Sequence, residues 1–412
     1  MRSLYFFVIK LYQIFIGLAS PFYFKAKLWK LGRRNLWKTL LKKCHGKQKI
    51  IWFHCASLGE FEQGKPLMVK IHEQHPDITI LVTFFSPSGY EIKKTDSCAE
   101  IITYLPMDTM GNAMRFLEIV NPIAAIFVKY EYWYGYMEAL SLRNIPFYYI
   151  SAIYRQSQIF FKPYGKWFVN QLSAATHIFV QNEDSRKLLQ MVGISQVSVA
   201  GDTRFDQVAR IAQNVEPITF VQQFKDNYKL IVAGSTWLPD EQVLKELFIH
   251  IANNYKLIIA PHEIDENHVS QIKKLFAPFG VIALSDIDNA NFSEYKVLII
   301  NKIGILKKIY QYSNISYIGG AFQTGLHNIL EAAVYGVPIF FGPHYGKFDE
   351  AKRLVAREGA FSIRNSEELY LMIKRFMEDN EYYQKCCKTC QEFVKENLGA
   401  AEMMYSHIKD KL

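Results

Sequence analysis

The hydrophobic and polar positions of the first half of the chain predict strands and helices in alternation. Short apolar runs recur after residue 48, and amphipathic or loop segments of 10 to 20 residues separate them. The runs are KIIWFHC (49–55), DITILVTFF (77–85), EIITYLP (100–106), AAIFVKY (124–130), IPFYYIS (145–151), THIFVQN (176–182) and VSVAG (197–201). Continuous apolar runs at this spacing are typical of parallel strands in βαβ units, because helices cover both faces of such a sheet.

The same alternation restarts after a polar stretch, and it predicts a second α/β half. Its runs are KLIVAGST (229–236), KLIIAPH (256–262), YKVLIIN (295–301), ISYIGGAF (315–322) and VPIFFGP (337–343). Two similar halves predict an α/β fold with two Rossmann-like domains facing a cleft, the layout of GT-B glycosyltransferases. Periplasmic-binding and two-domain dehydrogenase layouts remain alternatives at this level.

These patterns set the expected domain boundaries. We expect a membrane anchor with a basic flank over residues 1–48 and a Rossmann-like acceptor domain over 49–205. A helical linker is expected over 206–228, a second Rossmann-like domain over 229–395 and a C-terminal helix over 396–412.

The N-terminus predicts attachment to a membrane. The apolar run 4–24 is interrupted only by Lys10 and Gln13, and about 20 apolar residues suffice to cross a bilayer. Residues 25–49 then carry ten Lys and Arg residues, which by the positive-inside rule stay in the cytoplasm. The alternative is an amphipathic helix on the membrane surface, since leucines alternate with cations over residues 28–40. Both interpretations predict the inner, cytoplasmic face of a membrane.

Amino-acid composition and the motifs present limit the classes of partner and cofactor that we expect. The 412 residues are 50% hydrophobic and carry a net charge of +9, which favours nucleic acid, an anionic membrane or an anionic substrate. The six cysteines include one CxxC without a second pair, which is a poor zinc site. The sequence contains no Walker A loop, no HExxH and no DxD pair at a strand end. We therefore expect neither a metal nor a cofactor.

The stretch HCASLGEFEQGKP (54–66) holds the candidate general base. A strand ends near His54, Ser57 and Gly59 are predicted to form a tight turn, and Glu60 is predicted to begin a helix. A glutamate there is often only stabilised by the helix dipole, but this small-residue loop lies at the carboxyl edge of the sheet, where ligands bind. The dipole also lowers basicity, so burial or a neighbouring charge must compensate. Glu62 is the weaker candidate.

A second candidate site lies in residues 317–351. Gly319 and Gly320 end a strand, and HNILEAAVYG (327–336) is predicted to be a helix whose first N–H groups bind an anion. A carboxylate beside a phosphate site often binds ribose hydroxyls, so together these residues favour a sugar-nucleotide pocket. Its other predicted members, in this stretch and at two earlier strand ends, are Gly234, Ser235, Pro261, His262, Gly325, His327, Asn328 and Glu331.

Charged residues follow two strands of the first half. Lys129 and Glu131 come after one strand, and Arg155 follows the next. These side chains are predicted to meet an anionic acceptor, although each is equally compatible with a surface ion pair.

An ordered set of motifs resembles the 3-deoxy-D-manno-octulosonic acid (Kdo) transferases of lipopolysaccharide biosynthesis. It comprises HCASLGE, YLPMD, YEYW, VQNEDSRKLLQMVGI, GDTRFD, AGSTW, GGAF, GLHNILEAA and FGPHYGKFDEA. The resemblance runs from the N-terminal anchor to about residue 358. It implies an inverting, metal-independent GT-B enzyme that transfers Kdo from CMP-Kdo to the lipid A precursor, with no role for nucleic acid.

The resemblance also implies roles for residues of this sequence. Glu60 would be the general base for the acceptor hydroxyl, and Ser57 and Gly59 would shape its loop. The glycine-rich pocket of the second half would hold CMP. The sequence departs from the family pattern at Ala260-Pro261-His262-Glu263, which lacks the usual arginine, at Thr324-Gly325-Leu326-His327, and at NKIGIL (301–306). Another sugar-nucleotide GT-B transferase and an inactive membrane-tethered scaffold are the alternatives.

Overall fold

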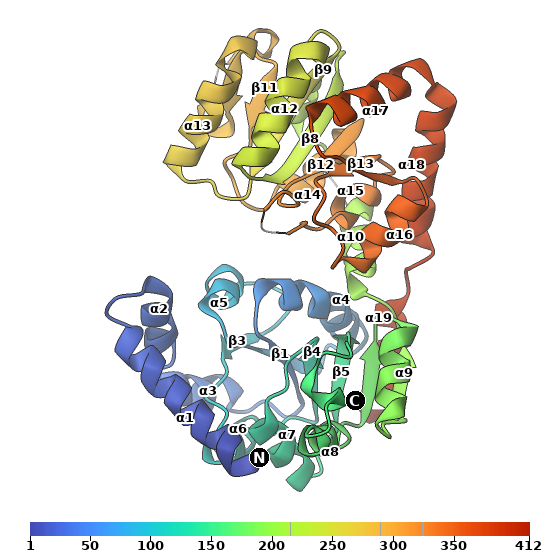
Figure 1. The fold of residues 1–412 in the computed structure, drawn as a ribbon. Coiled ribbons are helices and arrows are strands. Elements are labelled where there is room, and N and C mark those ends of the chain that lie inside the picture. The colour runs from blue at the N-terminus through green and yellow to red at the C-terminus, as the bar shows by residue number, and fades with distance from the viewer. Residues whose placement is uncertain (215, 289, 324) are drawn as a thin grey trace. The chain divides into compact units, whose positions relative to one another are not determined.

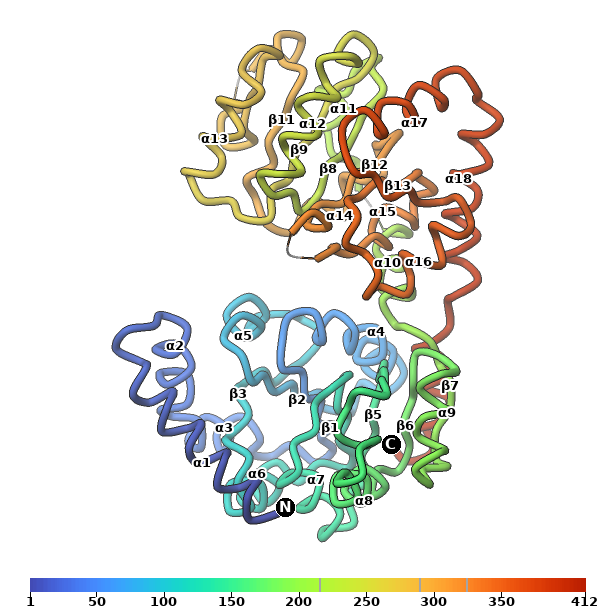
Figure 2. Tube along the Cα trace, in the orientation of Figure 1, coloured from blue at the N-terminus to red at the C-terminus, as the bar shows by residue number. Residues whose placement is uncertain are grey.

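A computed structural model of the chain describes residues 1–412 except 215, 289 and 324. The chain divides into two compact units (Figure 1). Unit 1 comprises Met1–Gln207 and Asn397–Leu412, and unit 2 comprises Val208–Glu396. The C-terminal segment thus returns to unit 1, where helix α19 packs against α4, as the red end of the trace in Figure 2 shows.

A parallel sheet of seven strands forms the centre of unit 1, in the order β3-β2-β1-β4-β5-β6-β7. Its strands are β1 (Ile50–Cys55), β2 (Thr79–Phe84), β3 (Ile101–Tyr104), β4 (Ala124–Val128), β5 (Phe147–Ala152), β6 (His177–Val180) and β7 (Val197–Val199). Every residue of the first five strands is buried. Adjacent residues of a strand point to opposite faces, so Trp52 packs in one apolar cluster and Phe53 in the other.

The helices of unit 1 precede, connect and follow these strands. They are α1 (Arg2–Ala19), α2 (Phe24–Gly32), α3 (Leu36–Cys44), α4 (Leu58–Gln74), α5 (Pro87–Lys93), α6 (Met110–Val120), α7 (Tyr134–Leu142), η1 (Ile159–Phe161), α8 (Lys166–Leu172), α9 (Glu183–Met191), α19 (Ala400–Ile408) and η6 (Lys409–Lys411). Helix α10 (Thr203–Gln213) begins in unit 1 and continues into unit 2.

Unit 2 repeats the architecture with a second parallel sheet of seven strands, in the order β10-β11-β9-β8-β12-β13-β14. Its strands are β8 (Lys229–Thr236), β9 (Tyr255–Pro261), β10 (Val281–Ala283), β11 (Val297–Ile299), β12 (Ile315–Ile318), β13 (Ile339–Phe341) and β14 (Ala360–Ser362). Its helices are α11 (Thr219–Lys225), α12 (Leu238–Ile251), α13 (Glu266–Phe276), η2 (Ala277–Phe279), η3 (Leu284–Asp286), η4 (Phe292–Glu294), α14 (Leu306–Ile309), η5 (Tyr310–Tyr312), α15 (Leu330–Ala333), α16 (Asp349–Ala356), α17 (Ser366–Glu378) and α18 (Asn380–Lys395).

Each sheet has a point where the strand order reverses. In unit 1 the reversal lies between β1 and β4, and in unit 2 it lies between β8 and β12. Open α/β sheets bind ligands outside the carboxyl ends of the strands at such a point. Glu60 follows β1 in the first turn of α4, and the loop after β12 contains Gly319 and Gly320, so the topology brings both candidate stretches to these positions.

Helix α1 is the one helix in the described part of the chain that is long and apolar enough to cross a membrane, and none of its residues is buried. Its N-terminal end is attached to unit 1 by two side chains. The Tyr5 hydroxyl donates to Asp108 Oδ2 (2.5 Å), and Arg2 forms a salt bridge with Glu138 on α7 (2.9 Å). Outside these contacts the helix exposes large apolar side chains, including Phe7 and Phe15.

Candidate active site

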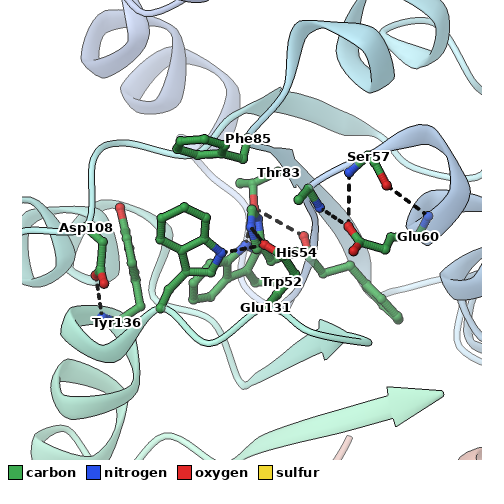
Figure 3. A network of polar contacts seen from close by, with 12 residues as sticks. Trp52, His54, Ser57, Glu60, Thr83, Phe85, Asp108, Glu131 and Tyr136 are labelled. Carbon is green, nitrogen blue, oxygen red and sulfur yellow. Dashed lines mark hydrogen bonds and ion pairs between the residues drawn. The ribbon is translucent and has the colours of Figure 1, made fainter. Parts of the chain in front are cut away.

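The loop after β1 forms a capping box at the start of α4. Ser57 is the N-cap, and its hydroxyl accepts from the Glu60 N–H (3.5 Å). Glu60 Oε2 in turn accepts from the Ala56 N–H (2.6 Å) and the Ser57 N–H (3.0 Å), as Figure 3 shows. The prediction that Gly59 forms a tight turn and that Glu60 begins the helix is wrong, because α4 already begins at Leu58 and Gly59 lies in its first turn.

The surroundings of Glu60 make it more basic than an ordinary carboxylate. Burial is the largest cause that raises its pKa, the negative charge of Glu131 is the second, and the resulting pKa is about 7. The two backbone hydrogen bonds and the positive charge of Lys129 act in the opposite direction. A helix N-terminus lowers the pKa of a glutamate, and in this protein burial offsets that effect. Glu60 can therefore accept a proton near neutral pH.

Glu131 is held in place by a buried polar network. Its Oε2 accepts from Trp133 Nε1 (2.6 Å) and lies 3.1 Å from His54 Nε2. The other ring nitrogen of His54 lies 2.8 Å from Thr83 Oγ1. His54 and Thr83 are fully buried on neighbouring strands, and Figure 3 shows this network beside the Glu60 loop. The fixed carboxylate of Glu131 thus places a negative charge next to Glu60.

The predicted acceptor residues gather at the carboxyl ends of three adjacent strands. Lys129 directly follows β4 and has a left-handed backbone (φ 66°), which turns the chain sharply at this edge. The exposed Arg155 follows β5, and its guanidinium lies 6.0 Å from the centre of the Tyr130 ring. The charge of Glu60 raises the pKa of Tyr130, although burial is the larger cause. Glu60, Lys129, Glu131 and Arg155 therefore lie at the same edge of the sheet, and their common role in acceptor binding stays a prediction.

The predicted donor residues gather at the carboxyl ends of β8, β9 and β12, which are neighbours in the second sheet. Gly234 pairs with β12, and Ser235 has a left-handed backbone (φ 54°). Pro261 ends β9. A side chain on Gly319 would place its Cβ only 2.4 Å from the carbonyl oxygen of Ser235, so glycine is required for this close approach.

The predicted helix over 327–336 is mostly absent, because α15 covers only Leu330–Ala333. The Asn328 side chain accepts from the Leu330 N–H (3.2 Å) and donates to Glu331 Oε1 (3.4 Å). This local bonding competes with helical hydrogen bonds. The N–H of Gly320 donates to Asp240 Oδ2 (3.0 Å), so it is satisfied inside the protein. The predicted helix over 327–336 is therefore wrong, and the anion site expected at its start stays a prediction.

Imidazole rings occupy the place expected for that anion site. His262 stacks between Trp237 (4.8 Å between ring centres) and His327 (4.5 Å). His327 Nε2 is buried and has no hydrogen-bond partner among the described residues. Burial and the neighbouring His262 lower the pKa of His327 to about 4, which keeps the ring neutral. A neutral imidazole can donate to a ligand. Gly325, with φ 110°, closes this loop onto Gly320.

Comparison with known proteins shows which family the chain resembles. Residues 30–207 match the family model of the 3-deoxy-D-manno-octulosonic-acid transferases (kdotransferases). The 3-deoxy-D-manno-octulosonic acid transferase of Aquifex aeolicus is 29% identical over 338 residues, which cover 81% of this chain and 86% of that protein. That of Chlamydia trachomatis serovar A is 24% identical over 399 residues, covering 93% and 90%. The chain is thus similar to Kdo transferases over most of its length, and residues 30–207 match the model of that family.

Kdo transferases are glycosyltransferases, and the fold of the protein agrees with that class. The structure of a UDP-GlcNAc 2-epimerase from Neisseria meningitidis is 17% identical and superposes with a TM-score of 0.62, covering 88% of this chain and 100% of that chain. At this identity the likeness concerns the fold alone, two Rossmann-like domains of the GT-B type. The activity of this protein must therefore be argued from its own side chains.

Sequence reasoning did not include four residues of this protein's sites. They are His54, Thr83 and Trp133 around Glu131, and Asp240, which accepts from Gly320 and from the Tyr317 hydroxyl (2.8 Å). Only His54 carried a signal, since a polar residue inside a fully buried strand needs a partner. The identity of that partner, 77 positions away, could not be read from the sequence.

We expect the acid limb of the pH–rate profile to follow the charges around Glu60. A base acts when ionised, so kcat/KM should rise as pH increases through a pKa of about 7. Glu131→Gln removes the negative neighbour, lowers the pKa of Glu60 and should move the limb about one unit to lower pH. Lys129→Asn removes a positive neighbour, which should raise the pKa of Glu60 and move the acid limb to higher pH. Asparagine is chosen because it tolerates the left-handed backbone at this position. If both variants had the same acid limb, the charges of Glu131 and Lys129 would not set the pKa of the catalytic base.

Proposed function

We propose that the protein transfers Kdo from CMP-Kdo to the lipid A precursor on the cytoplasmic face of the inner membrane. The observation that carries the proposal is a partly buried carboxylate, Glu60, whose pKa of about 7 suits a general base. It lies at the reversal point of the acceptor-side sheet, where ligands of such sheets bind. Similarity to the Kdo transferases supports the choice of sugar.

In this mechanism Glu60 removes the proton from a primary hydroxyl of the acceptor. The hydroxyl oxygen attacks the anomeric carbon of Kdo and forms the new glycosidic bond. The bond from that carbon to the CMP phosphate oxygen breaks on the opposite face, so configuration inverts. The proton remains on Glu60, and CMP leaves as an anion. The imidazoles of His262 and His327 are placed to donate to its single phosphate, and a monophosphate needs no bridging divalent cation.

The contacts of α1 support attachment to the membrane surface. The helix exposes apolar side chains, and lysines and arginines follow it on α2 and α3. Its N-terminal end is bound to Asp108 and Glu138 of unit 1. These contacts favour a helix that lies in the interface with unit 1 at the same membrane face, because a spanning helix would have to carry its first turn away from them.

Purified protein, CMP-Kdo and lipid A precursor test the proposal directly. We expect a product heavier than the acceptor by one or more Kdo units, formed equally well in the presence of a metal chelator. Mass spectrometry of the lipid reads the result. Transfer only from another sugar nucleotide would favour the alternative GT-B transferase, and absence of transfer and of CMP binding would favour an inactive scaffold. Loss of activity in chelator that magnesium restores would contradict the metal-free account.

A further inference from the structure

A cavity in unit 1 lies outside the sites described above. It has a volume of about 520 Å³, and α1, α2, α3, α6 and the segment before α6 line it. Three cations contribute to its wall, Lys30, Arg33 and Arg34, and no carboxylate does among the residues that the structure describes. Much of the remaining wall is apolar and includes Trp37 and Met107. A pocket with this lining matches an anion that carries a hydrocarbon part.

Arg33 is a cation without a counter-charge. Its guanidinium donates to the carbonyl oxygens of Leu105 (3.0 Å) and Phe85 (3.0 Å). It also lies 4.0 Å from the ring centre of Trp29 and 4.7 Å from that of Tyr104. In the described part of the chain no carboxylate contacts it, and burial lowers the pKa of Arg33 to about 9. A bound anion would offset part of the cost of burying this charge.

Trp29 adds a second unsatisfied group to the same cavity. Its side chain is 7% exposed, and its indole N–H has no partner in the described residues. Buried polar groups are normally paired, so an acceptor atom brought by a ligand would complete this environment. We infer that the cavity binds the phosphate group of an anionic lipid, with Lys30, Arg33 and Arg34 around the phosphate and the apolar wall against the lipid chain.

The cavity is connected to the candidate active site by direct contacts. Arg33 donates to the backbone of Phe85, whose ring lies 4.7 Å from that of Trp133. Trp133 donates to Glu131, the neighbour that raises the pKa of Glu60. Phe85 is the aromatic residue above this network in Figure 3. The lipid phosphate could belong either to a phospholipid of the bilayer or to the acceptor itself; the second source rests on the proposed function.

Titration of the full chain in neutral detergent tests the site without catalysis. The probe is monomeric dihexanoylphosphatidic acid, with dihexanoylphosphatidylcholine as the uncharged comparison. Lys30→Gln combined with Arg34→Gln removes two exposed wall cations, and it should weaken binding of the phosphatidic acid about 10-fold or more, because charge-assisted contacts to the phosphate are lost. Lys42→Gln with Lys43→Gln removes the same charge from α3 outside the cavity and should change binding less than about twofold.

Turnover with acceptors that carry or lack phosphate separates the two sources. If the acceptor supplies the phosphate, the Lys30/Arg34 variant should raise KM for the phosphorylated acceptor and leave KM for the dephosphorylated one unchanged. If a bilayer lipid supplies it, both KM values should stay constant in neutral detergent while binding of phosphatidic acid is lost. Equal titration curves for the Lys30/Arg34 and the Lys42/Lys43 variants would overturn the inference, whether or not the protein transfers Kdo.

Discussion

Replacement of Glu60 by glutamine is expected to lower kcat by about 10²- to 10⁴-fold, the usual contribution of a general base. Glutamine keeps the size of the side chain and can still accept from the Ala56 and Ser57 N–H groups through its carbonyl oxygen. It cannot take a proton from the acceptor hydroxyl. Because the loop keeps its shape, KM for the donor and the melting temperature should change little. Formation of labelled product at saturating substrates measures the effect.

Glu62→Gln is the matched control on the same helix. The Glu62 carboxylate pairs with Lys93 (2.7 Å) and accepts from Gln207 (3.2 Å), so it is directed toward other partners than Glu60. We expect its substitution to leave kcat within about twofold, since a partly exposed ion pair contributes little. If Glu60→Gln retained turnover close to that of Glu62→Gln, the assignment of Glu60 as the base would have to be abandoned.

The fold could be predicted from the sequence because its dominant signal is local. Strands buried on both faces are typically near-continuous apolar runs, and the mostly apolar runs Ile50–Cys55 and Thr79–Phe84 are buried at every residue. A few polar residues interrupt these runs, such as His54 and Thr83, without masking the pattern. The order of runs and helices then leaves few topologies, because parallel connections have one hand. The predicted α/β fold with two Rossmann-like halves is confirmed in each unit.

The chemistry around Glu60 could be predicted only in part, because it depends on contacts between distant segments. The sequence indicated that a helix N-terminus would lower the basicity of Glu60, and that something had to compensate. It did not show which contacts raise the pKa of Glu60. In the structure these are burial and the negative charge of Glu131, whose carboxylate contacts His54 and Trp133. Long-range polar partners of this kind follow from the packing of β1 against β4 rather than from any spacing along the chain.

The helix predicted after Gly325 failed for a local reason, because a side chain nearby in the sequence competes for the hydrogen bonds of the helix. Its composition favours a helix from His327 onward, yet the Asn328 side chain bonds to the Leu330 N–H and delays the helix to Leu330. Asparagine competes with the backbone in this way in loops and at helix starts. The sequence signal was therefore compatible with both outcomes, and in the structure the Asn328 side chain takes the Leu330 N–H.

Gly319→Ala is expected to destabilise unit 2 and to impair donor binding together. The new Cβ would lie 2.4 Å from the Ser235 carbonyl oxygen and 2.6 Å from the Thr236 Cα. These are backbone atoms of β8, which cannot rotate away as a side chain could. Overpacking costs about 1–3 kcal/mol, and the rigid neighbours place this case near the upper end. The melting temperature should fall by about 6–12 °C for a domain of this size, and KM for the donor should rise as the loops after β8 and β12 separate.

Gly346→Ala provides the control, because it adds the same methyl group where no atom lies within 4 Å. Its melting temperature and donor KM should match those of the wild type. The comparison separates close backbone approach from any general effect of replacing glycine, since both substitutions reduce the entropy of the unfolded chain equally. If Gly319→Ala had the same melting temperature as Gly346→Ala and bound the donor normally, the loops after β8 and β12 would not be in the tight contact that shapes the proposed CMP pocket.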